Sequence, residues 1–189
     1  MGFELVQLQA GVPGQPVPDD LFFRAHFCGV KSLQMQVLDL PDHGVKTKHG
    51  ADGPTVFDPI RRRWLVLTPE EWVRQHVLNH LVHDLGCPVS LIGVETPLTL
   101  NGLSKRADIV VHDRDGQPVL LVECKAPEVA LGQAVFEQAA RYNLVFKVRY
   151  LMVTNGLRHY CCTVDHQRGT VEFLPALPTF AVMAPDGRP

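Results

Sequence analysis

Two apolar runs flank a turn in the segment ADIVVHDRDGQPVLLVECK, which spans residues 107–125. The pair Asp115-Gly116 between the runs favours a two-residue type I′ turn, a common tight connection of a β-hairpin. In that turn Arg114 pairs with Gln117, so the numbers of partner residues along the two strands add up to about 231. The segment therefore predicts a hairpin of fixed register, and the register determines which side chains meet.

The register brings two acids and one base together at one end of the hairpin. Asp108 lies directly opposite Glu123, with Cβ atoms roughly 4.5–5.5 Å apart on one face of the sheet. Lys125 is two residues beyond Glu123 and shares that face. Two carboxylates at this spacing repel each other unless a cation or a proton lies between them. We therefore expect either a cation site or a compact ion-pair cluster.

Both interpretations of this cluster are chemically sound. Oxygen ligands suit a hard ion such as Mg²⁺, which keeps several waters and accepts a phosphate oxygen. The ion would polarise the phosphate, and Lys125 would orient or deprotonate the attacking water. In the competing interpretation Lys125 only neutralises the two acids at the end of a sheet, because structural ion pairs are common. The hairpin by itself favours neither.

One helix precedes the hairpin and another follows it. Thr68-Pro69-Glu70-Glu71 is typical of a helix start, with a capping threonine and a proline in the first position. Apolar residues then recur every few positions up to Leu85, and Gly86 ends the helix. A second helix is predicted over residues 130–146. Strands are predicted at residues 36–40, 63–67, 89–94, 109–111, 119–122, 150–154, 160–164 and 170–173. This order implies an α/β fold in which helices flank a central mixed β-sheet.

Length and composition indicate one globular domain with appendages. The chain has 189 residues, of which 46% are hydrophobic and 20% are charged, an ordinary balance for a soluble domain. We expect an N-terminal arm or appendage over residues 1–34, a domain over residues 35–178 and a C-terminal tail over residues 179–189. Residues 41–54 are rich in turn formers, and the proline-rich sequence after Leu174 predicts poor order.

Charge and cysteine usage restrict the class of protein. The formal net charge of −2 gives no overall basic field for DNA, although a local basic groove is compatible with it. The five cysteines include no Cys-x-x-Cys pair, so neither a disulfide framework nor a zinc knot is expected. No apolar run reaches the roughly 18 residues of a membrane span, and the N-terminus lacks the features of a secretion signal. We expect a cytoplasmic protein without a membrane partner.

The order of the motifs resembles a known nuclease group. Asp108 followed by Glu123-x-Lys125 is similar to the PD-(D/E)XK nuclease superfamily, with Ala107 where the name of the superfamily has proline. Within it, the chain resembles small stand-alone proteins similar to the N-terminal nuclease domain of type I restriction enzyme R subunits. The stretches that carry this resemblance are residues 57–60, 68–75, 105–111, 122–127, 136–143 and 153–156. The match covers about residues 35–178 and implies a restriction-endonuclease-like core.

The resemblance also implies a chemistry and a set of metal ligands. Members of the group use Mg²⁺, with Mn²⁺ as a substitute, to hydrolyse phosphodiester bonds of DNA. Asp108, Glu123 and the backbone carbonyl of Cys124 would hold the ion, and Glu71 matches the helix-borne acid that completes the site. Glu71 has a second explanation, since it lies three residues after the capping Thr68 and suits a capping box.

Further residues support the resemblance but have structural alternatives. Gln138 and Tyr142 fit a Gln-x-x-x-Tyr motif, share one helix face and are predicted to act near the phosphate or Lys125. Arg74 is expected to contact DNA or to form a salt bridge with the acid one turn before it. Lys105 and Arg106 border Asp108 and are expected to bind DNA phosphates, although charge runs are more often solvated surface.

Three functions remain open from the sequence. The first is a Mg²⁺-dependent DNA nuclease used in restriction or defence against foreign DNA. The second is a catalytically silent DNA-binding or partner-recruiting module of the same fold, and the third a structural protein whose acids pair with Lys125 and Arg106. A protein partner or a second copy of the chain is expected besides DNA. The sequence has no ATP-binding Gly-x-x-x-x-Gly-Lys-Ser/Thr motif, so translocation along DNA would need another protein.

Overall fold

A six-stranded mixed sheet forms the centre of the computed structural model, which describes residues 35–100 and 102–185. Its strands follow the chain in the order β4-β5-β6-β7-β8-β9, and only β6 and β7 are parallel. A parallel pair needs a crossover, and helix α2 (Gln133–Phe146) supplies it. The strands are β4 (Ile92–Leu100), β5 (Leu103–His112), β6 (Pro118–Cys124), β7 (Tyr150–Thr154), β8 (His159–Asp165) and β9 (Thr170–Leu174). The predicted mixed sheet flanked by helices is confirmed.

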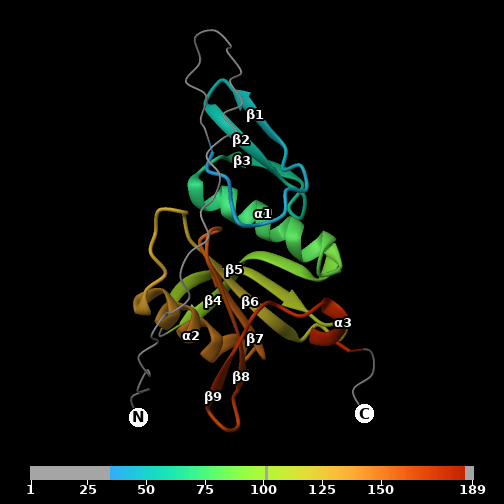
Figure 1. Ribbon diagram of the computed structural model, residues 1–189, viewed down its shortest axis with the longest axis vertical. Coiled ribbons are helices and arrows are strands. Elements are labelled where there is room, and N and C mark those ends of the chain that lie inside the picture. Colours follow the sequence, from blue (N-terminus) through green and yellow to red (C-terminus); the bar gives the residue numbers. More distant parts are fainter. Residues whose placement is uncertain (1–34, 101, 186–189) are drawn as a thin grey trace, which may run out of the picture. The chain divides into compact units, whose positions relative to one another are not determined.

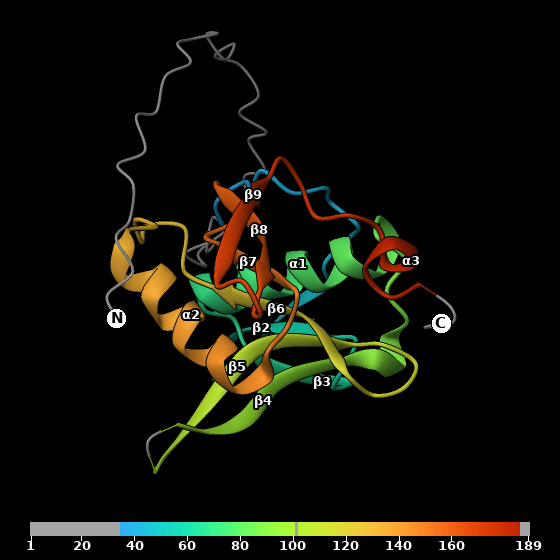
Figure 2. The same ribbon diagram turned by 90° about the horizontal axis from the view of Figure 1, so that it is seen from below.

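Helices cover both faces of this sheet, as Figure 1 shows. Helix α1 (Pro69–His83) and the short α3 (Phe180–Met183) pack on one face, against residues such as Ile109 and Val122. Helix α2 packs on the opposite face, against residues such as Val110 and Leu121. Successive residues of β5 and β6 thus enter different cores, as the alternation of a strand requires. Seen from below, α2 runs along the outside of the sheet (Figure 2).

A second, smaller sheet lies on the other side of α1. It consists of β1 (Thr47–Gly50), β2 (Gly53–Asp58) and β3 (Arg63–Val66), all antiparallel. Val56 of β2 is wholly buried, and the sheet stands above α1 in Figure 1. Because α1 is enclosed between two sheets, it buries polar as well as apolar side chains, among them Glu71, Arg74, Gln75 and His76.

The predicted start of α1 is confirmed. The hydroxyl of Thr68 accepts a hydrogen bond from the Glu71 amide at 3.1 Å, and Pro69 occupies the first turn. The helix ends at His83, two residues before the expected end, and Gly86 follows with a φ of +72°. None of the helices in the described residues combines the length and the apolar character needed to cross a membrane.

The predicted register of the hairpin is present in the strands. Ile109 pairs with Val122 and Val110 pairs with Leu121, so the partner numbers add up to 231. Continued by one residue, this register sets Asp108 opposite Glu123. The two strands therefore present the two acids at the same end of the hairpin.

The connection between these strands is not the expected two-residue turn. His112 pairs with Pro118, and the register shifts by one residue at a bulge next to His112. The carboxylate of Asp113 accepts hydrogen bonds from the amides of Asp115 and Gln117 at 3.0 and 2.8 Å, which organises a longer loop over residues 113–117. The longer loop and the bulge offset each other, so the register of the strands is the one predicted.

Two strand predictions near the start of the described chain are wrong. Residues 36–40 form no strand; Leu38 and Leu40 pack against the core instead, and the Asp39 amide donates to the Gly156 carbonyl at 2.7 Å. Their apolar pattern reflects packing rather than a ladder. The turn-rich residues 41–54 contain β1, whose four residues are all exposed, and therefore lack the apolar alternation that predicts strands.

The expectation of poor order after Leu174 is also wrong for the part that the structure describes. Leu177, Phe180 and Met183 are buried in the core that lies on the α1 face of the sheet. The Phe180 amide donates to the carbonyl of Leu85 at 2.7 Å. This segment covers the end of α1, which explains why its apolar residues are ordered despite the prolines.

Gly156, in the β7–β8 turn, allows a test of this packing. Its φ is +82°, and a Cβ there would lie 2.8 Å from Leu38 Cδ2 and 3.0 Å from Val73 Cγ2. The tip of Leu38 can rotate, but Val73 is wholly buried. We expect Gly156→Ala to cost about 1–3 kcal/mol of overpacking in addition to the roughly 1–2 kcal/mol of left-handed backbone strain.

The matched control is Gly169→Ala in the β8–β9 turn. Gly169 also has a positive φ, of +67°, but nothing lies within 4 Å of the position of its Cβ. Thermal unfolding should therefore show a Tm for Gly156→Ala that is lower than that of Gly169→Ala by roughly 2–4 °C for each kcal/mol of overpacking. Equal Tm values for the two variants would contradict the close approach of Leu38 and Val73.

Candidate active site

Asp108 lies at an irregularity in the sheet. Between β4 and β5 the register passes from Val94↔Ile109 to Thr96↔Ala107, which leaves Asp108 opposite Glu95. Glu95 has a φ of +50°, a left-handed conformation that distorts the strand locally. On the other side, Asp108 Oδ2 accepts the Cys124 amide hydrogen at 2.7 Å. The carboxylate of Asp108 thus replaces a backbone acceptor at the end of β6 and is held against that strand.

Glu123 is buried at the same end of β6, with 2% of its surface exposed. Its Oε1 accepts hydrogen bonds from Lys125 Nζ at 2.7 Å and from Gln138 Nε2 at 2.5 Å. Its Oε2 is buried and has no hydrogen-bond partner within the described residues. Burial, followed by the negative charge of Asp108, raises the pKa of Glu123 to about 7. One oxygen is therefore saturated and the other lacks the donor or cation that a buried carboxylate needs.

Lys125 neutralises only part of this charge. Burial lowers the pKa of Lys125, but its hydrogen bond to Glu123 and the charges of Glu123, Asp108 and Glu70 raise it more, so the net shift is upward. The ammonium is therefore the stable form of this side chain. Of the two roles expected for Lys125, orienting water and stabilising negative charge fit this form, whereas deprotonating water does not.

Helix α2 supplies the third side of the site. Gln138 donates to Glu123 and also to the hydroxyl oxygen of Tyr142, at 3.3 Å. Tyr142 is itself buried against the α2 face of the sheet. The Gln-x-x-x-Tyr motif thus reaches the acid of the Glu-x-Lys motif rather than Lys125 itself, and it fixes the orientation of the Glu123 carboxylate.

Glu71 and Arg74 lie in an ion-pair network on the α1 side. Arg74 donates to Glu71 Oε2 and, at 2.8 Å, to Asp108 Oδ1. Glu71 Oε1 accepts from Arg61 at 3.0 Å and from Gln75 at 2.7 Å. Both oxygens of Glu71 are thus taken by donors, and neither the expected approach to Glu123 nor the expected return to the Thr68 amide is among its contacts. Glu71 is connected to the site through Arg74.

The burial of Arg74 does not fit the expected contact with DNA. Only 6% of its side chain is exposed, and Glu70, Glu71 and Asp108 all bind its guanidinium. The salt-bridge alternative describes it correctly. Arg61 has a similar place: it binds Asp58 at 2.5 Å, Glu71 at 3.0 Å and Glu95 at 2.6 Å, and so ties the β2–β3 turn to the irregular part of β4.

Glu70 is the acid that the sequence patterns missed. Burial and the charge of Asp108 raise its pKa, and Glu70 in turn raises the pKa values of Glu123 and Lys125. Neighbouring residues on a helix differ in direction by about 100°, so Glu70 and Glu71 face different surroundings. Glu70 is the helix-borne acid whose charge the site senses.

Lys105 and Arg106 are exposed on β5 and pair with Leu98 and Pro97 of β4. They precede Asp108 on the same strand but make no printed contact with Glu123 or Lys125 within the described residues. Their exposure suits a contact with a phosphate backbone outside the carboxylate cluster.

The residues present fit a divalent cation in part. Among residues 35–100 and 102–185, no group of three His, Cys, Asp or Glu side chains is already arranged around an ion position. Two carboxylates and a backbone carbonyl are nevertheless a donor set that Mg²⁺ accepts, because it retains waters for its other positions. The bare Oε2 of Glu123 beside Asp108 is the observation that suits such an ion.

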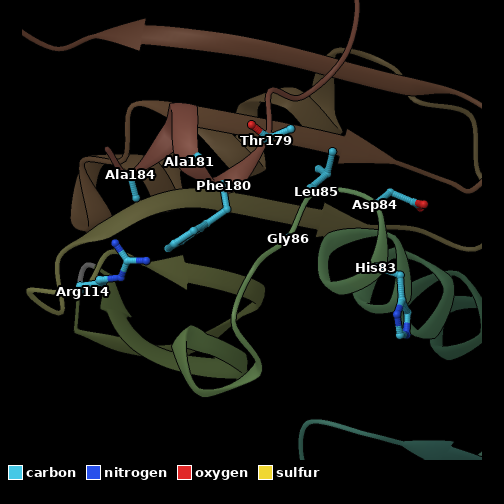
Figure 3. Close-up of a pocket in the computed structure, with 9 residues that line it drawn as sticks. All are labelled: His83, Asp84, Leu85, Gly86, Arg114, Thr179, Phe180, Ala181 and Ala184. Atoms are coloured by element: carbon cyan, nitrogen blue, oxygen red, sulfur yellow. The ribbon is translucent and has the colours of Figure 1, made fainter. Parts of the chain in front are cut away.

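A separate pocket of about 440 Å³ lies elsewhere (Figure 3). It is lined by the end of α1, by Arg114 and by α3, with Phe180 pointing toward its centre in the figure. Asp108, Glu123 and Lys125 are not among its lining residues. The candidate site is therefore at a sheet end and not in this pocket.

Comparisons with known proteins place the site in a family. The family described as the N terminus of type I restriction enzyme R proteins matches residues 69–178, more than half of the chain. A solved fragment of a putative HsdR subunit of a type I restriction enzyme from Vibrio vulnificus YJ016 is 25% identical over 60% of this chain, with a TM-score of 0.45. The match spans 24% of the length of that chain. The comparison with curated proteins gave no match. The matched range holds every predicted site residue, and the chain belongs to the family of type I restriction enzyme R protein N termini.

Proposed function

We propose that this chain is a divalent-metal-dependent deoxyribonuclease domain that hydrolyses phosphodiester bonds. The observation that carries the proposal is the buried, unpaired Oε2 of Glu123 beside Asp108, with Lys125 bound to the other oxygen of the same carboxylate. Structural ion-pair clusters satisfy both oxygens of a buried acid. An acid left half-satisfied next to a second acid suits a cation that arrives with the substrate.

Each residue then has a distinct role. Asp108, Glu123 Oε2 and the Cys124 carbonyl would hold Mg²⁺, or Mn²⁺ in its place; the bound ion supplies the positive charge that polarises the phosphate and activates water. Lys125, as an ammonium, would orient the water and stabilise the negative charge that develops on the phosphate. Gln138 fixes Glu123 Oε1, so that Oε2 stays directed to the site.

The family name supports a biological setting. Type I restriction enzyme R proteins are subunits of larger enzymes, so we propose restriction of foreign DNA as the setting, with DNA and other protein subunits as partners. Lys105 and Arg106 are proposed to contact the DNA backbone. The silent DNA-binding module predicted as the alternative has no observation in its favour, since Asp108, Glu123 and Lys125 are all present and connected.

A cleavage assay tests the proposal. Purified wild-type protein should nick supercoiled plasmid or degrade linear DNA with Mg²⁺ or Mn²⁺, and a chelator should stop the reaction. Glu123→Gln, purified in the same way, keeps a hydrogen-bonding group of the same size but loses the charge and should be inactive, which excludes a contaminating nuclease. Wild-type protein that binds DNA but cleaves neither substrate with either metal would support the silent module instead.

Glu70 and Glu71 should respond differently to neutralisation. Glu71→Gln breaks a buried ion-pair network and should destabilise the fold by about 3–5 kcal/mol, while Mg²⁺ affinity at low temperature stays within a few-fold of wild type. Glu70 is half-exposed, so Glu70→Gln should leave the Tm nearly unchanged and weaken Mg²⁺ binding by removing a nearby negative charge. Thermal unfolding and calorimetric Mg²⁺ titration of both variants measure this. A large loss of Mg²⁺ affinity in Glu71→Gln alone would restore Glu71 as a direct ligand.

A further inference from the structure

The small sheet has one buried and one outward face. Val56 and Asp58 of β2 are wholly buried, and Asp58 accepts a hydrogen bond from Gln75 of α1. The residues between them point the other way, because side chains alternate along a strand. The pairing of the strands then defines the outer face, which consists of Lys46, Lys48, Thr55, Phe57, Trp64 and Val66.

Large apolar groups on the outer face are exposed. Trp64 is 39% exposed and Val66 is 71% exposed. The rings of Trp64 and Phe57 lie 5.4 Å apart between centroids and are inclined by 58°. A tryptophan on the solvent side of a sheet adds nothing to the core beneath it, so its exposure calls for a partner.

The charge of the outer face has one sign. Its two ionisable residues, Lys46 and Lys48, are both exposed lysines, in a chain whose net charge is −2. The ammonium of Lys48 lies 4.1 Å from the centroid of the Trp64 ring. Arg62 and Arg63 are exposed where β3 begins. The face therefore combines aromatic surface with a local excess of positive charge.

This combination matches a single strand of nucleic acid. Bases of a single strand stack on exposed aromatic rings while basic side chains follow the phosphates, whereas bases of a duplex are already stacked on each other. The lysine over the Trp64 ring can move to a phosphate when a base takes its place, since exposed cation–π contacts are weak. A protein partner would have no need of a face whose charged members are all basic.

We propose that the outer face of the β1–β3 sheet binds single-stranded DNA, with a base stacked on Trp64 and phosphates near Lys46 and Lys48. The inference deepens the proposed function, on which the choice of DNA rests. Arg61 connects the β2–β3 turn to Glu71 and Glu95, so this sheet is fixed relative to the strand that faces Asp108. An unpaired strand held there would be a second contact for DNA besides the carboxylate site.

Fluorescence anisotropy of a labelled oligodeoxythymidine tests the proposal. The titration uses the full chain in chelator, so no cleavage is required. Trp64→Ala should weaken binding about tenfold, and Trp64→Phe should restore most of it, since one stacked base is worth roughly a factor of ten or more. Lys48→Glu should weaken binding and make it less dependent on salt. The matched controls are Phe173→Ala and Arg168→Glu on the β8–β9 hairpin, where Phe173 is 50% exposed and the Arg168 side chain 83% exposed.

The outcomes separate this inference from the proposed function. Equal affinities for wild type, Trp64→Ala and Lys48→Glu would overturn it, and so would a duplex or an oligoribonucleotide bound more tightly than the DNA strand. Sedimentation that shows a dimer of the wild type and a monomer of Trp64→Ala would assign the face to a second copy of the chain and overturn it as well. A chain that binds the oligonucleotide through Trp64 but never cleaves DNA would refute only the nuclease.

Discussion

Replacing Lys125 with alanine should lower the rate of DNA cleavage by at least about 10²–10³-fold, the usual cost of losing one group that stabilises charge in a transition state. Lys125 is a cation and cannot be a metal ligand, so its removal should leave Mg²⁺ binding intact. It also frees Glu123 Oε1, which Lys125 Nζ contacts at 2.7 Å, and the two acids become less neutralised. Mg²⁺ affinity should therefore stay equal or rise slightly.

The measurement separates turnover from binding. Single-turnover cleavage rates report the chemical step, and calorimetric titration reports Mg²⁺ affinity of the same preparation. Arg168→Ala, which removes an exposed cation on the β8–β9 turn, is the control for a general loss of charge. Cleavage by Lys125→Ala at the wild-type rate would show that the mechanism is wrong, even where the fold is right.

Neutralising Asp108 should have the opposite signature. Asp108→Asn should weaken Mg²⁺ binding by more than the roughly 10–100-fold that the loss of an outer-shell partner costs, and cleavage should be lost with it. The asparagine can still accept the Cys124 amide hydrogen, which the wild-type carboxylate accepts at 2.7 Å. The fold should therefore tolerate this change.

Asp108→Ala is the comparison that separates metal binding from stability. It removes the acceptor for Cys124 and one partner of the buried Arg74 guanidinium. We expect it to lose Mg²⁺ binding as Asp108→Asn does, and to unfold at a lower temperature. Unchanged Mg²⁺ affinity in Asp108→Asn would show that Asp108 acts only as a structural acceptor.

The sequence predicted the hairpin better than its turn. Asp115-Gly116 indicated a two-residue turn, yet Asp113 organises a longer loop and a bulge at His112 restores the register. Apolar alternation on β5 and β6 specifies the register strongly, because a slip of one residue would turn every core side chain outward. The position of Asp108 relative to Glu123 followed from that constraint and not from the turn.

The helix-borne acid shows what a linear pattern cannot resolve. Glu70 and Glu71 are adjacent, and the capping pattern and the family motif both selected Glu71. The structure engages Glu71 with Arg61, whose position depends on β2, a strand that the sequence did not predict. The rotation of α1 between two sheets is set by such tertiary contacts. The same contacts bury Arg74, which was expected to reach DNA.

The central claim is that one divalent ion binds between Asp108 and Glu123, and a crystal structure of the wild-type protein with Mn²⁺ tests it most directly. The account predicts an anomalous peak at ligand distance, about 2.0–2.2 Å for oxygen donors to small divalent ions, from Asp108 and from Glu123 Oε2, and no peak there in Asp108→Asn. A site that stays empty at Mn²⁺ concentrations supporting cleavage, or a peak bound elsewhere on the chain, would contradict it.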